Sequence, residues 1–141
     1  MYDIIVLGAG PGGYVAAIKG AQLGAKVLLI EKEKVGGICL NHGCIPTKTL
    51  LKSAKVYKTV LEASSFGVDL SGKAKVNIVK MIDRKNKVVS QLTNGISYLL
   101  RKNKVDVVYG YGEVKSAHEV VVSNKSYTTK KLIIATGAST F

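Results

Sequence analysis

A glycine-rich turn, GAGPGG at residues 8–13, stands between a short apolar run and a helical pattern. Residues 2–7, YDIIVL, are apolar and β-branched, as in a strand that is buried on both faces. Residues 14–24 have helical periodicity and end at a glycine, and residues 26–30, KVLLI, form a second apolar strand. This order predicts a βαβ unit, in which the two strands are parallel and the crossover is right-handed.

The same turn predicts a dinucleotide site. Gly8 permits the tight turn, Gly10 lets the backbone approach a pyrophosphate, and Gly13 lets helix and strand pack closely. The start of the helix presents unpaired N–H groups to the phosphates. Glu31 closes the second strand, where a carboxylate accepts hydrogen bonds from ribose hydroxyls and repels a 2′-phosphate. A glycine turn that merely packs is the alternative, and the pattern does not say which dinucleotide binds.

Downstream, the chain alternates between helical and strand patterns. A helical pattern follows the cysteine segment, and FGVDLSG at residues 66–72 interrupts it. A second long helix is expected over residues 76–102, with these apolar side chains toward the core: Val79, Ile82, Val89, Leu92, Ile96 and Leu99. Strand-like segments with tight polar turns follow, at residues 105–114, 119–123 and 126–137, and they indicate an antiparallel meander. The expected fold class is α/β, a Rossmann-like parallel sheet with helices and an attached antiparallel β-meander.

Both cysteines of the chain lie in one short segment, GGICLNHGCIPTK. In a regular helix the Cα atoms of Cys39 and Cys44 would lie ~8–9 Å apart, whereas a disulfide needs about 7 Å or less. A bridge therefore requires irregular backbone, which Gly43 and Pro46 allow. This composition favours a reducible disulfide at a helix start, where the helix terminus stabilises a thiolate once the bridge opens. A metal site that includes the intervening histidine, and inert packing of both thiols, remain as alternatives.

The cysteine segment closely resembles the redox-disulfide signature of the flavin disulfide reductases. Its CLN…GCIPTK form is most similar to that of dihydrolipoamide dehydrogenases. The GAGPGG turn, Glu31, this signature and a closing IIATGAS occur in the order of that family and cover the whole chain. The resemblance implies an FAD-binding domain of the glutathione-reductase type, with FAD as the dinucleotide. Glutathione, mercuric and trypanothione reductases are also similar, so the resemblance identifies the class more specifically than the substrate.

The resemblance also implies roles for individual residues. Cys39 is the interchange thiol that attacks or releases the substrate disulfide, and Cys44 lies against the isoalloxazine as the charge-transfer thiolate. Lys48 approaches the reactive edge of the flavin, where a cation stabilises negative charge on the reduced ring. His42 departs from the small apolar residue common at its position, and we interpret it as a surface histidine. The remaining contacts to FAD are assigned to Gly8, Gly10, Pro11, Gly12, Gly13, Glu31, Lys32, Gly37, Gly112, Ala135, Thr136 and Gly137.

Members of this family are longer than 141 residues. They continue beyond the IIATG motif into an NAD(H) domain and a dimer-interface domain that carries a His-Glu catalytic base. The chain contains no second GxGxxG motif. We therefore expect residues 1–141 to be the N-terminal segment of the FAD-binding domain, with the NAD and dimer-interface domains absent.

By the same resemblance, the parent is expected to be a homodimer. It is expected to oxidise the dihydrolipoyl group of a 2-oxoacid dehydrogenase complex to the lipoyl disulfide, with NAD⁺ as acceptor. The fragment alone is expected to lack NAD-linked turnover. Two alternatives come from other classes: a stand-alone flavin or nucleotide-binding module, and a thiol–disulfide exchange protein that acts without flavin.

The formal net charge is +12, and 13 of the 21 basic residues lie between Lys48 and Lys104. Aromatic residues do not interleave with these charges as a stacking platform requires, so nucleic-acid binding is not expected. No apolar run approaches the roughly 18–20 residues that span a bilayer, so membrane insertion is not expected either. The chain opens directly on a strand pattern without a basic leader, and it has only two cysteines. We therefore expect a cytoplasmic location and a catalytic role for the cysteines.

Overall fold

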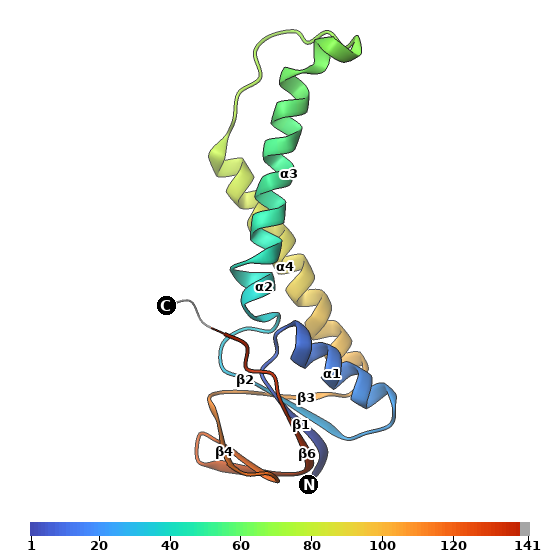
Figure 1. The fold of residues 1–141 in the computed structure, drawn as a ribbon, viewed down its shortest axis with the longest axis vertical. Coiled ribbons are helices and arrows are strands. Elements are labelled where there is room, and N and C mark those ends of the chain that lie inside the picture. The colour runs from blue at the N-terminus through green and yellow to red at the C-terminus, as the bar shows by residue number, and fades with distance from the viewer. Residues whose placement is uncertain (139–141) are drawn as a thin grey trace.

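A six-stranded sheet and two long helices that extend away from it make up the fold (Figure 1). The structure is a computed structural model that describes residues 1–138; the last residue of the IIATGAS motif, Ser139, lies outside them. Strand β1 (Tyr2–Leu7), helix α1 (Pro11–Gln22) and strand β2 (Val27–Glu31) form the expected βαβ unit. The register of β1 and β2 is parallel, and it confirms the prediction from the glycine turn.

The strand order is β3-β2-β1-β6-β5-β4. Strand β3 (Asp106–Tyr109) pairs in parallel with β2, and the second half of β6 (Lys125–Ile134) pairs in parallel with β1. The first half of β6 pairs antiparallel with β5 (Glu119–Val122), which pairs antiparallel with β4 (Gly112–Ser116). The long strand β6 thus joins the parallel sheet to the predicted meander.

The segment 105–114 differs from the expectation, because it contributes to both kinds of sheet. It was expected to belong to the antiparallel meander, but its first part forms β3 and pairs in parallel. Gly110 adopts φ 148° between β3 and β4, and its N–H donates to the carbonyl of Glu31 at 2.9 Å. A conformation that glycine adopts readily therefore ends β3 and lets β4 leave the parallel sheet.

The core has two parts, one on each face of the parallel sheet. Side chains alternate along the strands, so successive residues enter opposite clusters. On one face, Val6 and Leu29 pack with Ala17 of α1. On the other, Ile5 and Leu28 pack with Val120 of the meander. Both faces of β1 and β2 are covered, which explains why their sequences are continuous apolar runs.

Helices α2 (Gly37–Asn41) and α3 (Cys44–Leu61) lead to a 3₁₀ turn, η1 (Ala63–Phe66), and to α4 (Ile78–Lys102). Of the α4 residues expected in the core, Ile96 is buried, together with Leu100, which was not predicted. The expectation was wrong for Val79, Ile82, Leu92 and Leu99, which are exposed. The first half of α4 packs along α3, and only its second half reaches the sheet (Figure 1). Over residues 1–138, none of the helices is long and apolar enough to cross a membrane.

Candidate functional site

The GAGPGG turn connects β1 to α1 at the carboxyl edge of the parallel strands. Gly8 adopts φ 101°, and its N–H donates to the carbonyl of Ile30 at 2.8 Å. A Cβ on Gly8 would overlap the carbonyl oxygen of Ala135, and a Cβ on Gly13 would overlap the carbonyl oxygen of Gly8. The first and last glycines of the turn are therefore required by close backbone packing, as the motif predicts.

The start of α1 is open enough to receive a phosphate. Pro11 is the first helical residue, and the first intrahelical bond runs from the Tyr14 N–H to the Gly10 carbonyl at 3.0 Å. The amides of Gly12 and Gly13 precede that bond, as orphan donors of a helix start do. Gly12 is exposed, and a Cβ placed on it would meet nothing within 4 Å among the described atoms. The turn therefore offers both donors and space for an anion.

Glu31 ends β2 and cross-links the site. Its carboxylate is buried, with Oε2 accepting from the Ala9 N–H at 2.7 Å and Oε1 accepting from the Glu33 N–H at 2.8 Å. Each carboxylate oxygen has a further lone pair that can accept from a ribose hydroxyl. The neighbouring Lys32 is exposed and lies 3.6 Å from the carboxylate of Glu33. Glu31 thus holds the glycine turn in place, and its contact with a nucleoside stays a prediction.

Cys39 and Cys44 form a disulfide, with their Cα atoms 4.7 Å apart. This distance is reached because α2 ends at Asn41 and α3 begins at Cys44, so the two cysteines do not share one helix. The predicted irregular backbone is therefore confirmed. Pro46 lies in the first turn of α3, where an N–H would have no intrahelical partner. The bridge joins both sulfurs of the chain.

The segment that carries the disulfide, residues 36–48 (the disulfide segment), contacts the glycine turn directly. The Gly36 N–H donates to the carbonyl of Ala9 at 2.8 Å. A Cβ on Gly37 would lie 2.8 Å from the Cα of Gly10, so a larger residue would push the two segments apart. Both glycines have positive φ, which glycine tolerates at little cost. Gly36 was missing from the predicted site residues, although the glycine pair before the cysteines was a visible signal.

The other predicted residues are distributed around this junction. Ala135 follows β6, and its N–H donates to the carbonyl of Leu7 at 2.8 Å, so Ala135, Thr136 and Gly137 begin beside the glycine turn. Lys48 is exposed on α3, one helical turn beyond Cys44. Its approach to a flavin stays a prediction.

Gly112 and His42 have different surroundings. A Cβ on Gly112 would crowd the side chains of Leu7 and Ile30, so this glycine has a packing role; its contact with a cofactor stays a prediction. His42 is exposed, as interpreted from the sequence.

Two titratable groups at the amino end of β1, the end opposite to the glycine turn, have shifted pKa values. Burial and a hydrogen bond to Asp106 raise the pKa of Tyr2 to about 12. The Lys130 ammonium, 2.7 Å from Asp3, and a hydrogen bond from the Lys26 N–H lower the pKa of Asp3. Both groups lie at the amino end of β1, whereas the glycine turn follows its carboxyl end. They are therefore separate from the candidate site.

Comparisons with known proteins identify relatives that are named as disulfide oxidoreductases or dihydrolipoyl dehydrogenases. The family model described as pyridine nucleotide-disulphide oxidoreductase matches residues 2–141. A dihydrolipoyl dehydrogenase from Acholeplasma laidlawii is 63% identical over 138 residues, which are 98% of this chain and 41% of that protein. One from Bacillus subtilis is 52% identical over 113 residues, which are 80% of this chain and 24% of that protein.

The solved structures include a similar fold. The HOCl-induced flavoprotein disulfide reductase RclA from Escherichia coli matches with a TM-score of 0.82 and 33% identity. The match covers 99% of this chain and 29% of that protein. The chain therefore spans less than half of the length of these relatives.

Proposed function

The chain belongs to the pyridine nucleotide-disulphide oxidoreductase family, and we propose that it is the N-terminal, FAD-binding part of a dihydrolipoamide dehydrogenase. The names of the two relatives support this substrate class. The share of their length that the chain covers supports a longer parent, with the NAD and dimer-interface domains in the remainder. The parent oxidises the dihydrolipoyl group of a 2-oxoacid dehydrogenase complex with NAD⁺ and acts as a homodimer.

One observation carries this proposal: the disulfide segment is seated on the glycine turn. Gly36 is hydrogen-bonded to Ala9, and Gly37 packs against Gly10. A dinucleotide whose pyrophosphate lies at the start of α1 would therefore extend past the paired sulfurs. A nucleotide-binding turn or a disulfide alone would fit many functions, but their contact favours a cofactor that exchanges electrons with the bridge.

The described residues fit FAD. The orphan amides at Gly12 and Gly13 would hold the pyrophosphate, and Glu31 would accept the adenosine ribose hydroxyls. Ala135, Thr136 and Gly137 would add backbone contacts from the adjacent strand end. When bound, FAD supplies a two-electron acceptor that takes the electron pair from the reduced cysteines and passes it on to NAD⁺.

The chemistry of the bridge is thiol–disulfide exchange. A dihydrolipoyl thiolate attacks the sulfur of Cys39, the Cys39–Cys44 bond breaks, and the electron pair leaves on the sulfur of Cys44. The second dihydrolipoyl sulfur gives its proton to the His-Glu base of the parent and attacks the mixed disulfide. The bond between the first lipoyl sulfur and Cys39 breaks, the lipoyl disulfide leaves and Cys39 becomes a thiolate. The substrate has lost two electrons and two protons, one to water when its first thiol ionised and one to the His-Glu base.

The surroundings of Cys44 favour this direction of cleavage. Cys44 is the first residue of α3, where the positive end of the helix dipole stabilises a thiolate. Lys48 lies one turn further along the same helix and adds a cation. The sulfur of Cys44 is therefore the better leaving group, and Cys39 is the sulfur that exchanges with substrate.

An absorbance titration tests the proposal. Added FAD is expected to bind to the chain, and reduction by dihydrolipoamide is expected to produce a long-wavelength thiolate-to-flavin band. The variant Cys44→Ser is expected to bind FAD without that band, whereas Cys39→Ser retains a free Cys44 thiolate and shows the band before reduction. FAD binding with no such band in any variant would support a stand-alone flavin module. Disulfide exchange without FAD binding would support a flavin-independent exchange protein.

A further inference from the structure

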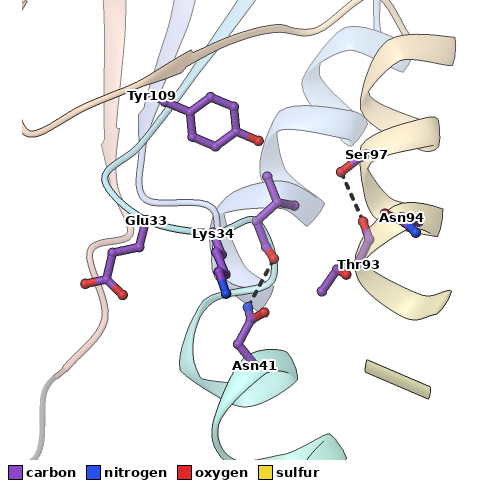
Figure 2. A pocket seen from close by; sticks show the side chains of 8 residues that line it. Glu33, Lys34, Asn41, Thr93, Asn94, Ser97 and Tyr109 are labelled. Carbon is purple, nitrogen blue, oxygen red and sulfur yellow. Dashed lines mark hydrogen bonds between the residues drawn. The ribbon is translucent and has the colours of Figure 1, made fainter. Parts of the chain in front are cut away.

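Asn41, the last residue of α2, donates one side-chain hydrogen bond to the first residue of its own helix and one to the loop that precedes the helix. Its side-chain Nδ2 donates to the carbonyl of Gly37 at 2.9 Å and to the carbonyl of Val35 at 3.2 Å. Figure 2 shows the Asn41 side chain pointing at this loop, which connects the end of β2 to the start of α2. The residue is partly buried, and it lies between the two cysteines in sequence. None of the catalytic steps above uses it.

The two carbonyls bracket the contact between the disulfide segment and the glycine turn. Between them lies Gly36, whose N–H donates to the Ala9 carbonyl. Gly37 itself packs on Gly10. A change at Asn41 would therefore alter the position of the glycine pair relative to the turn that is proposed to hold the pyrophosphate.

Packing does not hold this loop on every side. A cavity of about 290 Å³ opens between the loop, α2, α4 and the end of β3 (Figure 2). The residues that line it are Glu33, Lys34, Val35, Asn41, Thr93, Asn94, Ser97 and Tyr109. Val35 itself packs into the core, but the neighbouring Glu33 and Lys34 are exposed and border this open space. The two hydrogen bonds from Asn41 therefore add to packing that covers the loop on one side only.

We propose that Asn41 is a positioning residue that sets the disulfide segment against the dinucleotide turn, so that FAD affinity and disulfide stability depend on it together. Only the part of this inference that concerns FAD affinity rests on the proposed function. An amide is required because both bonds are donated to carbonyl oxygens. An aspartate of the same shape has no donor when ionised, and it would place a charge against two carbonyls.

The test compares Asn41→Asp with two matched variants. Asn103, the residue that caps the end of α4, also donates from Nδ2 to the carbonyl four residues earlier, Leu99, at 2.8 Å, and it lies far from the site in sequence. Asn94→Asp places the same negative charge on the wall of the same cavity from α4. The first control measures the loss of an equivalent bond, and the second measures the effect of the charge alone.

Three quantities are measured for each variant. They are the dissociation constant for FAD, the thiol–disulfide equilibrium constant in a glutathione buffer without FAD, and the protection of the Gly36 amide from hydrogen exchange with solvent. For Asn41→Asp we expect FAD binding weaker by about tenfold, a disulfide equilibrium shifted by about tenfold and loss of Gly36 protection. Asn103→Asp and Asn94→Asp are expected to leave all three within about twofold, the scatter of surface substitutions.

Equal values for Asn41→Asp and Asn103→Asp in all three measurements would overturn the proposal. If the unmodified chain does not bind FAD, the proposed function fails. The disulfide equilibrium and the Gly36 amide still decide the role of Asn41. Should Asn41→Asp not fold, Asn41→Ala removes the donors without adding charge and is expected to shift the same quantities in the same direction.

Discussion

The parallel sheet and the α3–α4 pair bury their apolar side chains to very different extents. In the sheet, Leu28 and Leu29 are fully buried. On the helical pair, Leu51 is 63% exposed and Val79 is 70% exposed. The sheet is covered on both faces by helices and meander, whereas each long helix is covered mainly by the other. The disulfide begins α3, so it lies at the junction of a densely packed region and a loosely covered one.

This difference indicates how the two regions contribute to the protein. Continuous burial makes the parallel sheet a rigid frame, because close-packed side chains resist displacement. The exposed helical pair buries fewer apolar contacts, so local opening there is expected to cost less free energy than in the sheet. The predictions below test this contrast, from the largest expected effect to the smallest.

The largest effect is expected from truncating leucines in the two regions. Leu29→Ala removes a fully buried side chain from β2 and is expected to lower the free energy of unfolding by about 2–5 kcal/mol. Leu51→Ala removes an exposed side chain from α3 and is expected to change it by about 0.5 kcal/mol or less. Chemical denaturation followed by circular dichroism measures both. Similar losses would show that the helical pair is as tightly packed as the sheet.

A pair of glycines in one helix gives the next test of the rigid frame. A Cβ on Gly13 would overlap a backbone oxygen, so Gly13→Ala is expected to destabilise the fold by about 3 kcal/mol, the upper end for overpacking. Gly12→Ala meets open space and is expected to be neutral or to stabilise α1 by up to about 1 kcal/mol. Thermal unfolding of the two variants distinguishes them. A tolerated alanine at residue 13 would mean that the turn moves freely.

Lys48 tests the helical side of the junction, since it lies on α3. Lys48→Met keeps the aliphatic stem but removes the proposed cation near the flavin, so the reduction potential of bound FAD should become more negative. The reduced flavin is expected to lose stabilisation of order 1 kcal/mol, the upper range for exposed charge pairs. Lys52→Met, one further turn along α3, is the matched control and should leave the potential unchanged. Equal potentials for the two variants would place Lys48 away from the flavin.

The smallest effect on stability is expected at the amino end of β1, far from the site. The pKa of Tyr2 is raised to about 12 by burial and by its bond to Asp106, above the ordinary value of 10.0. A raised pKa means that the folded state holds the proton more tightly, so the contribution of Tyr2 is present below pH 10 and is lost between pH 10 and about 12. Tyr2→Phe should flatten the fall in melting temperature across that window. An unchanged slope would contradict the shift.

The βαβ unit and the disulfide segment could be predicted from the sequence because their causes are local. Within the turn, Gly8 has positive φ and Gly13 packs on the carbonyl of Gly8. A bridge between Cys39 and Cys44 requires a break in the helix because of the distance limit of a disulfide. The surroundings of α4 could not be predicted in this way. Helical spacing identifies an apolar stripe, but what covers the stripe depends on tertiary contacts, and Val79 and Leu92 face outward.

The split of residues 105–114 and the role of Asn41 were missed for related reasons. Strand-like composition does not distinguish β3, which pairs in parallel, from β4, which pairs antiparallel, because pairing is a long-range property. Asn41 lies inside a recognised motif, yet its partners are backbone carbonyls, and side chains in the pattern do not reveal them.

The central claim is that the bridge lies beside a flavin whose pyrophosphate rests on the first glycine turn. The most direct measurement is a crystal structure of the chain with FAD bound. We expect the phosphates at the amides of Gly12 and Gly13, and the isoalloxazine ring in van der Waals contact with the sulfur of Cys44. FAD bound with its ring remote from both cysteines, or a diphosphate bound away from the start of α1, would contradict the account.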